Sequence, residues 1–335
     1  MTTRHPSPTR PYRDVPVIHR AHWKWLVILY FFLGGIAGAA QFVAGLASLS
    51  DRQRNHRTAR IARLVSFFAF LPCPLLLVLD LRKPSRFLNM LRIVKFRSPM
   101  SIGSWTLALF GGAATASALR ETLGSEDRVV PPTWFRAALE LGSAAAPALG
   151  VVLSGYTGTL LAATAVPVWA KGSRWIGPLF LTSATASATS LVETVLTLGD
   201  APPSDAERVG HLEGICSVAE VALLAGWLRS VAAYDRPLLR GEAAWPFRHL
   251  TVGAGLALPL ALRAFSPRLP RPARTAATVL GTGLTLTGGL ALRYALVVAG
   301  AESADDPEAT FRFTSGSATS HPPEAKLASA TRSAP

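Results

Sequence analysis

The chain has 335 residues, of which 50% are hydrophobic and only 16% are charged, and its mean hydropathy is +0.31. Soluble domains carry about 25% charged residues, so this composition excludes an ordinary soluble domain and indicates a membrane protein. The formal net charge of +14 would favour nucleic-acid binding in a soluble chain. Here the basic residues lie between apolar runs, where lipid headgroups or an acidic partner explain them better, and we expect no nucleic-acid partner.

The first predicted element is an uncharged run at residues 25–50, which follows a polar, basic tail at residues 1–24. About 20 apolar residues cross the hydrocarbon core of a bilayer, so this run predicts a transmembrane helix. Gly34, Gly38 and Gly45 recur along it at helical spacing, which favours close packing against a neighbouring helix.

Seven further apolar runs follow this first helix. They cover residues 64–79, 98–119, 141–170, 175–198, 209–228, 249–262 and 275–301. Pro72 and Pro74 interrupt the second run, and the fourth is longer than one straight span requires, with Pro147 predicting a kink and Pro167 an exit. Residues 302–335 are rich in small and polar residues and are expected to be disordered.

The pattern as a whole predicts an all-α integral membrane protein with about eight transmembrane helices, arranged as a bundle of two four-helix halves. Its transmembrane domain would cover residues 25–301. Eight spans place both termini on one side of the membrane. The tails and the even-numbered connections hold more Lys and Arg than the odd-numbered ones, so the positive-inside rule favours cytoplasmic termini.

Metal and haem ligands are scarce in the sequence. The two cysteines, Cys73 and Cys216, lie in apolar runs and form no C-x-x-C pair, so we expect neither a zinc site nor an Fe–S cluster. The seven histidines lie almost entirely in loops or at the ends of runs, and no pair lies at mid-membrane depth. A haem bound by this chain is therefore not expected either.

The stretch 80–110, DLRKPSRFLNMLRIVKFRSPMSIGSWTLALF, joins the second and third runs and carries six basic residues against the single acid Asp80. A polar segment between two spans must lie at a membrane surface. The stretch resembles the loop between the second and third helices of the NrfD-like family, the membrane subunits of polysulfide-reductase-type complexes. Three further strings are similar to that family, namely LYFFLGGIAGAA, SGYTGTLL with a downstream PVW, and LRYALVVAG.

The resemblance implies a membrane subunit of a respiratory-type oxidoreductase complex in the bacterial cytoplasmic (inner) membrane. Such a subunit exchanges electrons between the pool of menaquinone or ubiquinone and a ferredoxin-like Fe–S subunit. A molybdopterin or haem subunit usually lies beyond that Fe–S partner, so a chain without redox ligands of its own fits this division of labour. Membrane lipid is the other expected partner.

Tyr156 is the strongest candidate for contact with a quinone. A buried phenol can donate a hydrogen bond to a quinone carbonyl, and Gly155 and Gly158 would leave room for the ring. The alternative is an interhelical hydrogen bond from a packed tyrosine. The resemblance favours the ligand role, because a tyrosine on the fourth helix of the family is implicated in quinone binding.

Weaker candidates for the same quinone pocket lie at or near the first helix and in the stretch 80–110. The first-helix string is near the quinone pocket in the family. These candidates are Tyr30, Gly34, His22, Asp80 and Arg82. For Asp80 and Arg82, a salt bridge at the end of a helix is the simpler explanation.

Ionisable residues inside the spans form the last group of candidates. Charged groups in a membrane are costly and usually face a cavity or a partner. They are Glu140, Glu193, Glu213, Glu220 and Arg293, with His211 nearer an end. Either they relay protons between a quinone pocket and water, or Arg293 pairs with a glutamate and fixes helix packing. The ion pair is favoured for Arg293.

Two other functions fit the same sequence. Proline and glycine interruptions together with buried charges also describe a membrane transporter with broken helices, although the two halves carry no evident internal repeat. A third possibility is a non-catalytic anchor that holds an Fe–S partner at the membrane without binding quinone.

Overall fold

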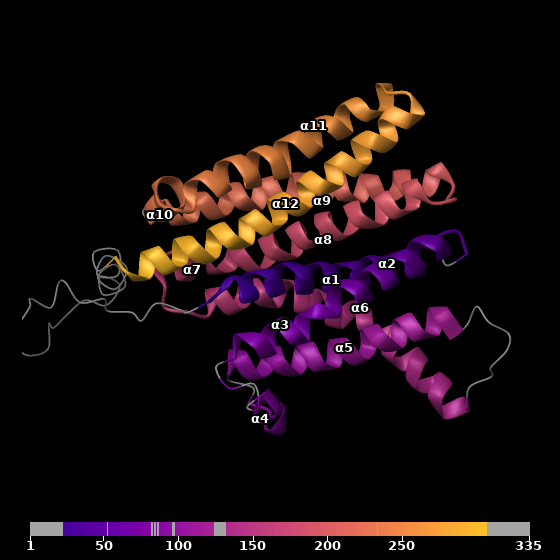
Figure 1. Ribbon diagram of the computed structural model, residues 1–335, viewed down its shortest axis with the longest axis horizontal. Coiled ribbons are helices and arrows are strands. Elements are labelled where there is room, and N and C mark those ends of the chain that lie inside the picture. Colours follow the sequence, from indigo (N-terminus) through magenta and orange to yellow (C-terminus); the bar gives the residue numbers. More distant parts are fainter. Residues whose placement is uncertain are drawn as a thin grey trace, which may run out of the picture.

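The computed structural model describes residues 23–306 except 52, 82, 84, 86, 96–97, 124–131 and 233. This part of the chain is helical throughout and contains no strand (Figure 1). The helices are α1 (Trp25–Ser50), α2 (His56–Phe70), α3 (Pro72–Asp80), α4 (Phe87–Arg92), α5 (Pro99–Leu123), α6 (Thr133–Ala162), α7 (Pro167–Lys171), α8 (Ser173–Leu198), α9 (Pro203–Val231), α10 (Arg236–Arg240), the π-helical η3 (Pro246–Ala257), α11 (Leu258–Phe265), the short 3₁₀ turn η4 (Ser266–Arg268) and α12 (Arg271–Ala304).

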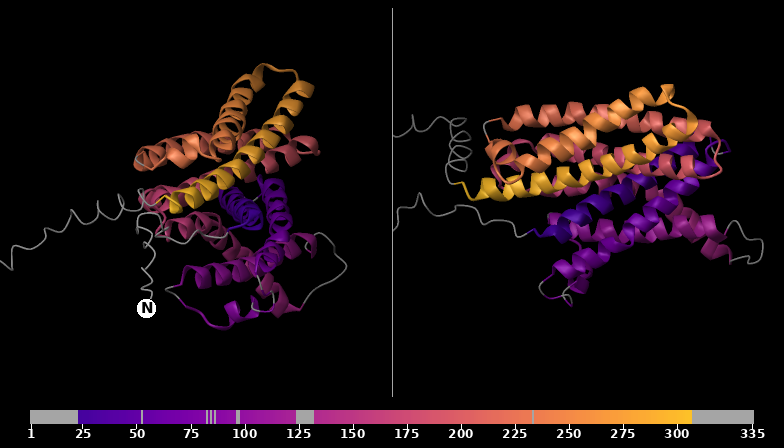
Figure 2. Two further views of the ribbon diagram at one scale, coloured as in Figure 1. Left: turned by 60° about the vertical axis from the view of Figure 1, so that its left-hand side comes forward. Right: turned by 45° about the horizontal axis from the view of Figure 1, so that its top comes forward.

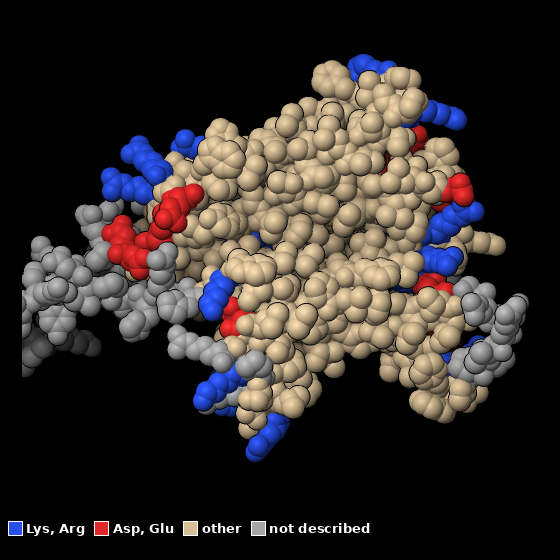
Figure 3. Space-filling view, in the orientation of Figure 1, with Lys and Arg blue, Asp and Glu red and all other residues tan. Residues whose placement is uncertain are grey.

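Eight helical stretches of the described residues are long and apolar enough to cross a membrane, as the sequence predicts. They are α1, α2 with α3, α5, α6, α8, α9, η3 with α11 and η4, and α12. The prediction of an all-α membrane protein is therefore confirmed. Charged side chains gather at the two ends of the helices, with a broad band of uncharged atoms between them (Figure 3). Large apolar side chains are exposed in that band, as lipid-facing residues should be.

Several predicted boundaries differ from those of the structure. The second span begins at His56, whereas the apolar run begins at residue 64. The fourth span begins at Thr133 and ends at Ala162, whereas the apolar run predicts 141–170. Pro167 begins a separate short helix, α7, because a proline is well suited to a first helical turn, where its missing N–H leaves no bond unmade. Pro147 lies inside α6. The second span breaks at Leu71, and Pro72 starts α3 in the same way.

The two four-helix halves repeat one packing pattern. The first helix of each half contacts the second and the fourth, and the fourth contacts the third. In the first half these are α1 with α2 and α6, and α6 with α5; in the second they are α8 with α9 and α12, and α12 with η3. The two halves meet where α8 of the second half contacts α1 and α6 of the first half, and α1 lies at this boundary (Figure 2). The sequence carries no sign of this internal resemblance.

Glycines allow the closest of these helix contacts. A Cβ on Gly38 of α1 would lie closer than 3.0 Å to the Gly150 carbonyl oxygen of α6, and Gly255 of η3 meets Gly288 of α12 equally closely. Backbones at this distance gain dispersion contacts that larger residues would prevent. The small-residue stripe on the first helix is therefore a packing surface, as expected.

Candidate functional site

Tyr156 projects from α6 toward the beginning of α5. Its hydroxyl donates a hydrogen bond to the carbonyl oxygen of Pro99, and its ring lies on Gly103, where a Cβ would come within 2.5 Å of the phenol. The interhelical hydrogen bond considered as the alternative for Tyr156 is therefore present. The expected role of Gly158 is wrong, because the backbone of Ile176 on α8 fills the space beside it.

Tyr30 lies nearby on α1, close enough to Tyr156 and Cys73 to interact with them electrostatically. Its side chain is 4% exposed. The missing side chain of Gly34 leaves space between the Tyr30 ring edge and the Cys73 sulfur, which lie 3.5 and 3.9 Å from the position of a Cβ.

Asp80 is the last residue of α3, which packs against α1. Its Oδ1 atom is buried without a hydrogen-bond partner. His22 and Arg82 lie outside the described residues, so their predicted places in the pocket stay predictions. The structure thus brings Tyr30, Gly34 and Tyr156 together at one end of the bundle, with Asp80 on an adjacent helix.

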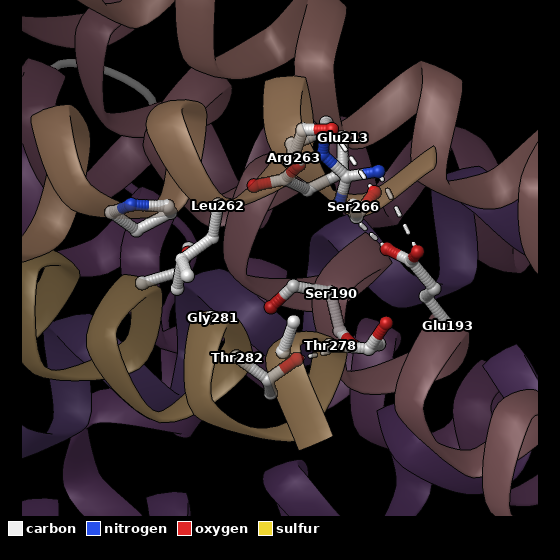
Figure 4. Close-up of a pocket in the computed structure, with 12 residues that line it drawn as sticks. Ser190, Glu193, Glu213, Leu262, Arg263, Ser266, Thr278, Gly281 and Thr282 are labelled. Atoms are coloured by element: carbon white, nitrogen blue, oxygen red, sulfur yellow. Dashed lines mark hydrogen bonds and ion pairs between the residues drawn. The ribbon is translucent and has the colours of Figure 1, made fainter. Parts of the chain in front are cut away.

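A second group of polar residues lies in the C-terminal half, around Arg263 of α11 (Figure 4). Its Nη2 lies 2.7 Å from Oε2 of Glu193 on α8, and its Nε lies 2.6 Å from Oε2 of Glu213 on α9. One guanidinium therefore ties three helices together. Arg263 is not among the residues predicted from the sequence, because the seventh apolar run ends at Leu262, one residue earlier. Continuing the helical pattern to Phe265 would have placed it inside the span.

A small cavity of about 30 Å³ adjoins this ion cluster. It is lined by Ser190, Thr278, Thr282 and Thr285 as well as by the two carboxylates. The Thr285 hydroxyl is buried and has no partner among the described residues. A cavity of this size holds about one water molecule, which the polar lining could bind.

Polar contacts continue from this cluster toward the middle of the bundle. Ser217 donates a 3.0 Å hydrogen bond to Oε1 of Glu213, and Glu220 lies two helical turns further along α9. The Glu220 carboxyl interacts with the hydroxyl of Ser183 on α8 and with the charge of Arg293 on α12. The four predicted residues Glu193, Glu213, Glu220 and Arg293 therefore lie in one row of buried charges, the buried charged line.

Arg293 is fully buried, and its partners differ from those expected. Nη1 donates to Ser183 Oγ at 3.0 Å and to the Gly289 carbonyl at 2.7 Å, while Nη2 donates to the Phe180 carbonyl at 3.3 Å. The guanidinium also lies over the rings of Phe32 and Phe180. It makes no direct salt bridge with any carboxylate in the described part of the chain, so the ion pair predicted for it is replaced by the one at Arg263.

Two of the predicted ionisable residues do not join this line. Glu140 and His211 are both exposed, near the beginnings of α6 and α9. Within the described residues, no group of three or more His, Cys, Asp or Glu side chains is placed to hold a metal ion.

An eight-helix membrane bundle with a tyrosine cluster at one end and a buried charged line belongs to the class of multi-pass integral membrane proteins. Comparison with known families places it further. Residues 17–303 match the family described as polysulphide reductase, NrfD. The chain belongs to the NrfD family, whose members are membrane subunits of oxidoreductase complexes and work with other subunits. No curated protein matches the chain.

Proposed function

We propose that this chain is the quinone-reactive subunit of a bacterial inner-membrane oxidoreductase complex, with cytoplasmic termini. It would exchange electrons between menaquinone or ubiquinone and a ferredoxin-like Fe–S subunit, with a molybdopterin or haem subunit beyond. Family membership supports the complex, and the position of Tyr30, which is 4% exposed and lies beside Tyr156, supports the quinone.

The residues around Tyr30 suit a quinone headgroup. Tyr30 would donate a hydrogen bond to a carbonyl oxygen, and Gly34 would leave space for the ring. The Tyr156 hydroxyl already donates its proton to the Pro99 carbonyl, so Tyr156 would contribute by lining the edge of the pocket. Asp80 would hold or release a proton at its buried Oδ1. A bound quinone would carry two electrons and two protons.

The buried charged line suggests which residues could move protons. Glu193 and Glu213 are engaged with Arg263, which makes them a structural ion cluster. Glu220 interacts with the Ser183 hydroxyl, with the more distant Arg293 guanidinium and with the charge of Glu213, but makes no direct salt bridge with the other described residues. We therefore assign proton exchange to Glu220 and helix fixation to the other two. In liposomes, Glu220→Gln should abolish any proton movement coupled to quinol oxidation, and the exposed Glu140→Gln should leave it intact.

The decisive experiment measures binding of a quinol-like inhibitor to the purified complex. Tyr30→Phe should weaken saturable binding by about 1–2 kcal/mol, the value of a hydrogen bond lost without a change of shape. Tyr294→Phe is the matched control, since Tyr294 is 39% exposed on α12. An intact complex that binds no inhibitor would instead support the non-catalytic anchor. No binding and no co-purifying Fe–S subunit would support the transporter.

A further inference from the structure

An apolar groove of about 480 Å³ runs along the outer face of α5, away from the buried charged line. Its floor follows one helical stripe from Ser104 through Ala108 and Gly112 to Leu119. The sixteen residues from Ser104 to Leu119 extend about 24 Å along the helix, more than the ~15 Å thickness of one leaflet's hydrocarbon. The groove is therefore long enough to hold an extended acyl chain.

The walls of the groove come from neighbouring helices. Phe70 and Pro74, on either side of the break between α2 and α3, form one wall, and Phe87 of α4 closes the end beside Ser104. Leu75 and Leu109 nearby are more than half exposed, as expected of residues that face lipid. The groove thus opens toward the bilayer and not toward the interior of the bundle.

The end of the groove closed by α4 carries a basic rim. Lys83, Arg92 and Lys95 are exposed, and Asp80 is the only acid in residues 80–97. The backbone amide of Lys95 donates a 2.9 Å hydrogen bond to Ser101 Oγ. This bond joins the basic rim to α5 about one turn before Ser104. Figure 3 shows Lys and Arg side chains gathered at this end, at the lower left, where Figure 1 labels α4.

The segment that carries this rim also presents apolar side chains to its surroundings. Leu88, Ile93 and Val94 are 72%, 57% and 44% exposed, directly beside Arg92 and Lys95. Exposed apolar side chains next to exposed basic ones are typical of a segment that lies in the headgroup region of a membrane. Basic residues in that region attract anionic lipid.

From these contacts we propose that the α3–α5 groove binds one anionic phospholipid. Its acyl chain lies on the α5 stripe between Phe70 and Phe87, and its phosphate is held by Arg92 and Lys95. The basic rim argues for a phospholipid rather than the tail of a neutral quinone, which would have no use for these charges. The inference is independent of the proposed quinone function.

Gly112 and Gly283 make a matched pair for the test. A Cβ on either glycine meets nothing within 4 Å, so a leucine should be tolerated at both positions. Gly112→Leu fills the groove, whereas Gly283→Leu changes an exposed site on α12. The full-length protein would be titrated in detergent with dioleoyl phosphatidylglycerol and with dioleoyl phosphatidylcholine, and the rise in unfolding temperature would be followed.

The wild type and Gly283→Leu should show a saturable rise with phosphatidylglycerol that phosphatidylcholine does not give. Gly112→Leu and Arg92→Gln/Lys95→Gln should each need about tenfold more phosphatidylglycerol for half of the effect. Native mass spectrometry of the wild type and the double variant gives a second count of retained lipid, should Gly112→Leu fold poorly. Equal responses to the two lipids would overturn the proposal. The proposal would also be overturned if a long-chain quinone displaced the lipid equally easily from the wild type and from Arg92→Gln/Lys95→Gln.

Discussion

Arg263 and Glu193 are joined by a 2.7 Å ion pair that ties α11 to α8 within the membrane-spanning part of the chain. The same guanidinium holds Glu213 of α9 at 2.6 Å, so one positive charge faces two carboxylates. Removal of the cation would leave two like charges close together in a largely buried site. The first prediction follows from this arrangement.

Arg263→Gln should lower the free energy of unfolding by about 2–3 kcal/mol, less than the loss expected for a fully buried pair because the Arg263 side chain is 29% exposed. Adding Glu193→Gln and Glu213→Gln should restore part of this loss, since the stranded charges disappear. Arg268→Gln, on an exposed residue of η4, is the control. Thermal unfolding in detergent measures all four proteins. A loss that the triple variant fails to reduce would contradict the electrostatic explanation.

Gly38→Ala should separate α1 from α6. The added methyl group would lie closer than 3.0 Å to the Gly150 carbonyl oxygen, a backbone atom that cannot turn away. We expect a destabilisation of about 1–3 kcal/mol, as for an overpacked core. Gly283→Ala has open space around its Cβ and should be neutral or stabilising by up to about 1 kcal/mol. Equal unfolding temperatures for the two variants would refute the close contact.

Gly103→Ala should disturb the proposed quinone pocket without replacing any of its polar groups. Its methyl group would occupy the place of the Tyr156 ring and so break the hydrogen bond to Pro99. Binding of a quinol-like inhibitor should weaken about tenfold, as for the loss of roughly 1.4 kcal/mol. The exposed Gly112→Ala, on the same helix, should bind like the wild type. Unchanged binding in Gly103→Ala would place the quinone elsewhere.

Arg293→Met should separate stability from activity. Methionine keeps much of the volume, and it removes the desolvation cost of a buried guanidinium that makes no direct salt bridge with the other described residues. If Arg293 only supports helix packing, a variant that still folds should still oxidise quinol within the complex. We expect the fold to persist and turnover to fall, because Glu220 loses the positive charge that it faces. Unfolding temperature and turnover are compared in one preparation, and full activity would assign Arg293 to packing alone.

The elements differ in how much of them could be predicted. The eight spans follow from length and hydropathy, because a bilayer demands about 20 apolar residues whatever the fold. Their ends do not, since a helix can continue through polar residues such as Thr133, Arg136 and Glu140 into the headgroup region. Pro167 is predicted as an exit, but its role as the start of α7 depends on the chain turning back toward α8.

The sequence by itself determined the class of protein, the number of spans, the family resemblance and four of the buried charges (Glu193, Glu213, Glu220 and Arg293), but not Arg263. The tertiary structure alone decided which of those charges meet. Arg293 and the glutamates are equally plausible partners by composition, but the guanidinium reaches Ser183 and backbone carbonyls, while Arg263 takes the carboxylates. The same holds for Tyr156, whose hydroxyl donates to the Pro99 carbonyl at the beginning of α5. The physical reason is that hydropathy depends on each segment alone, whereas a side chain's partners depend on how helices distant in sequence are rotated against one another.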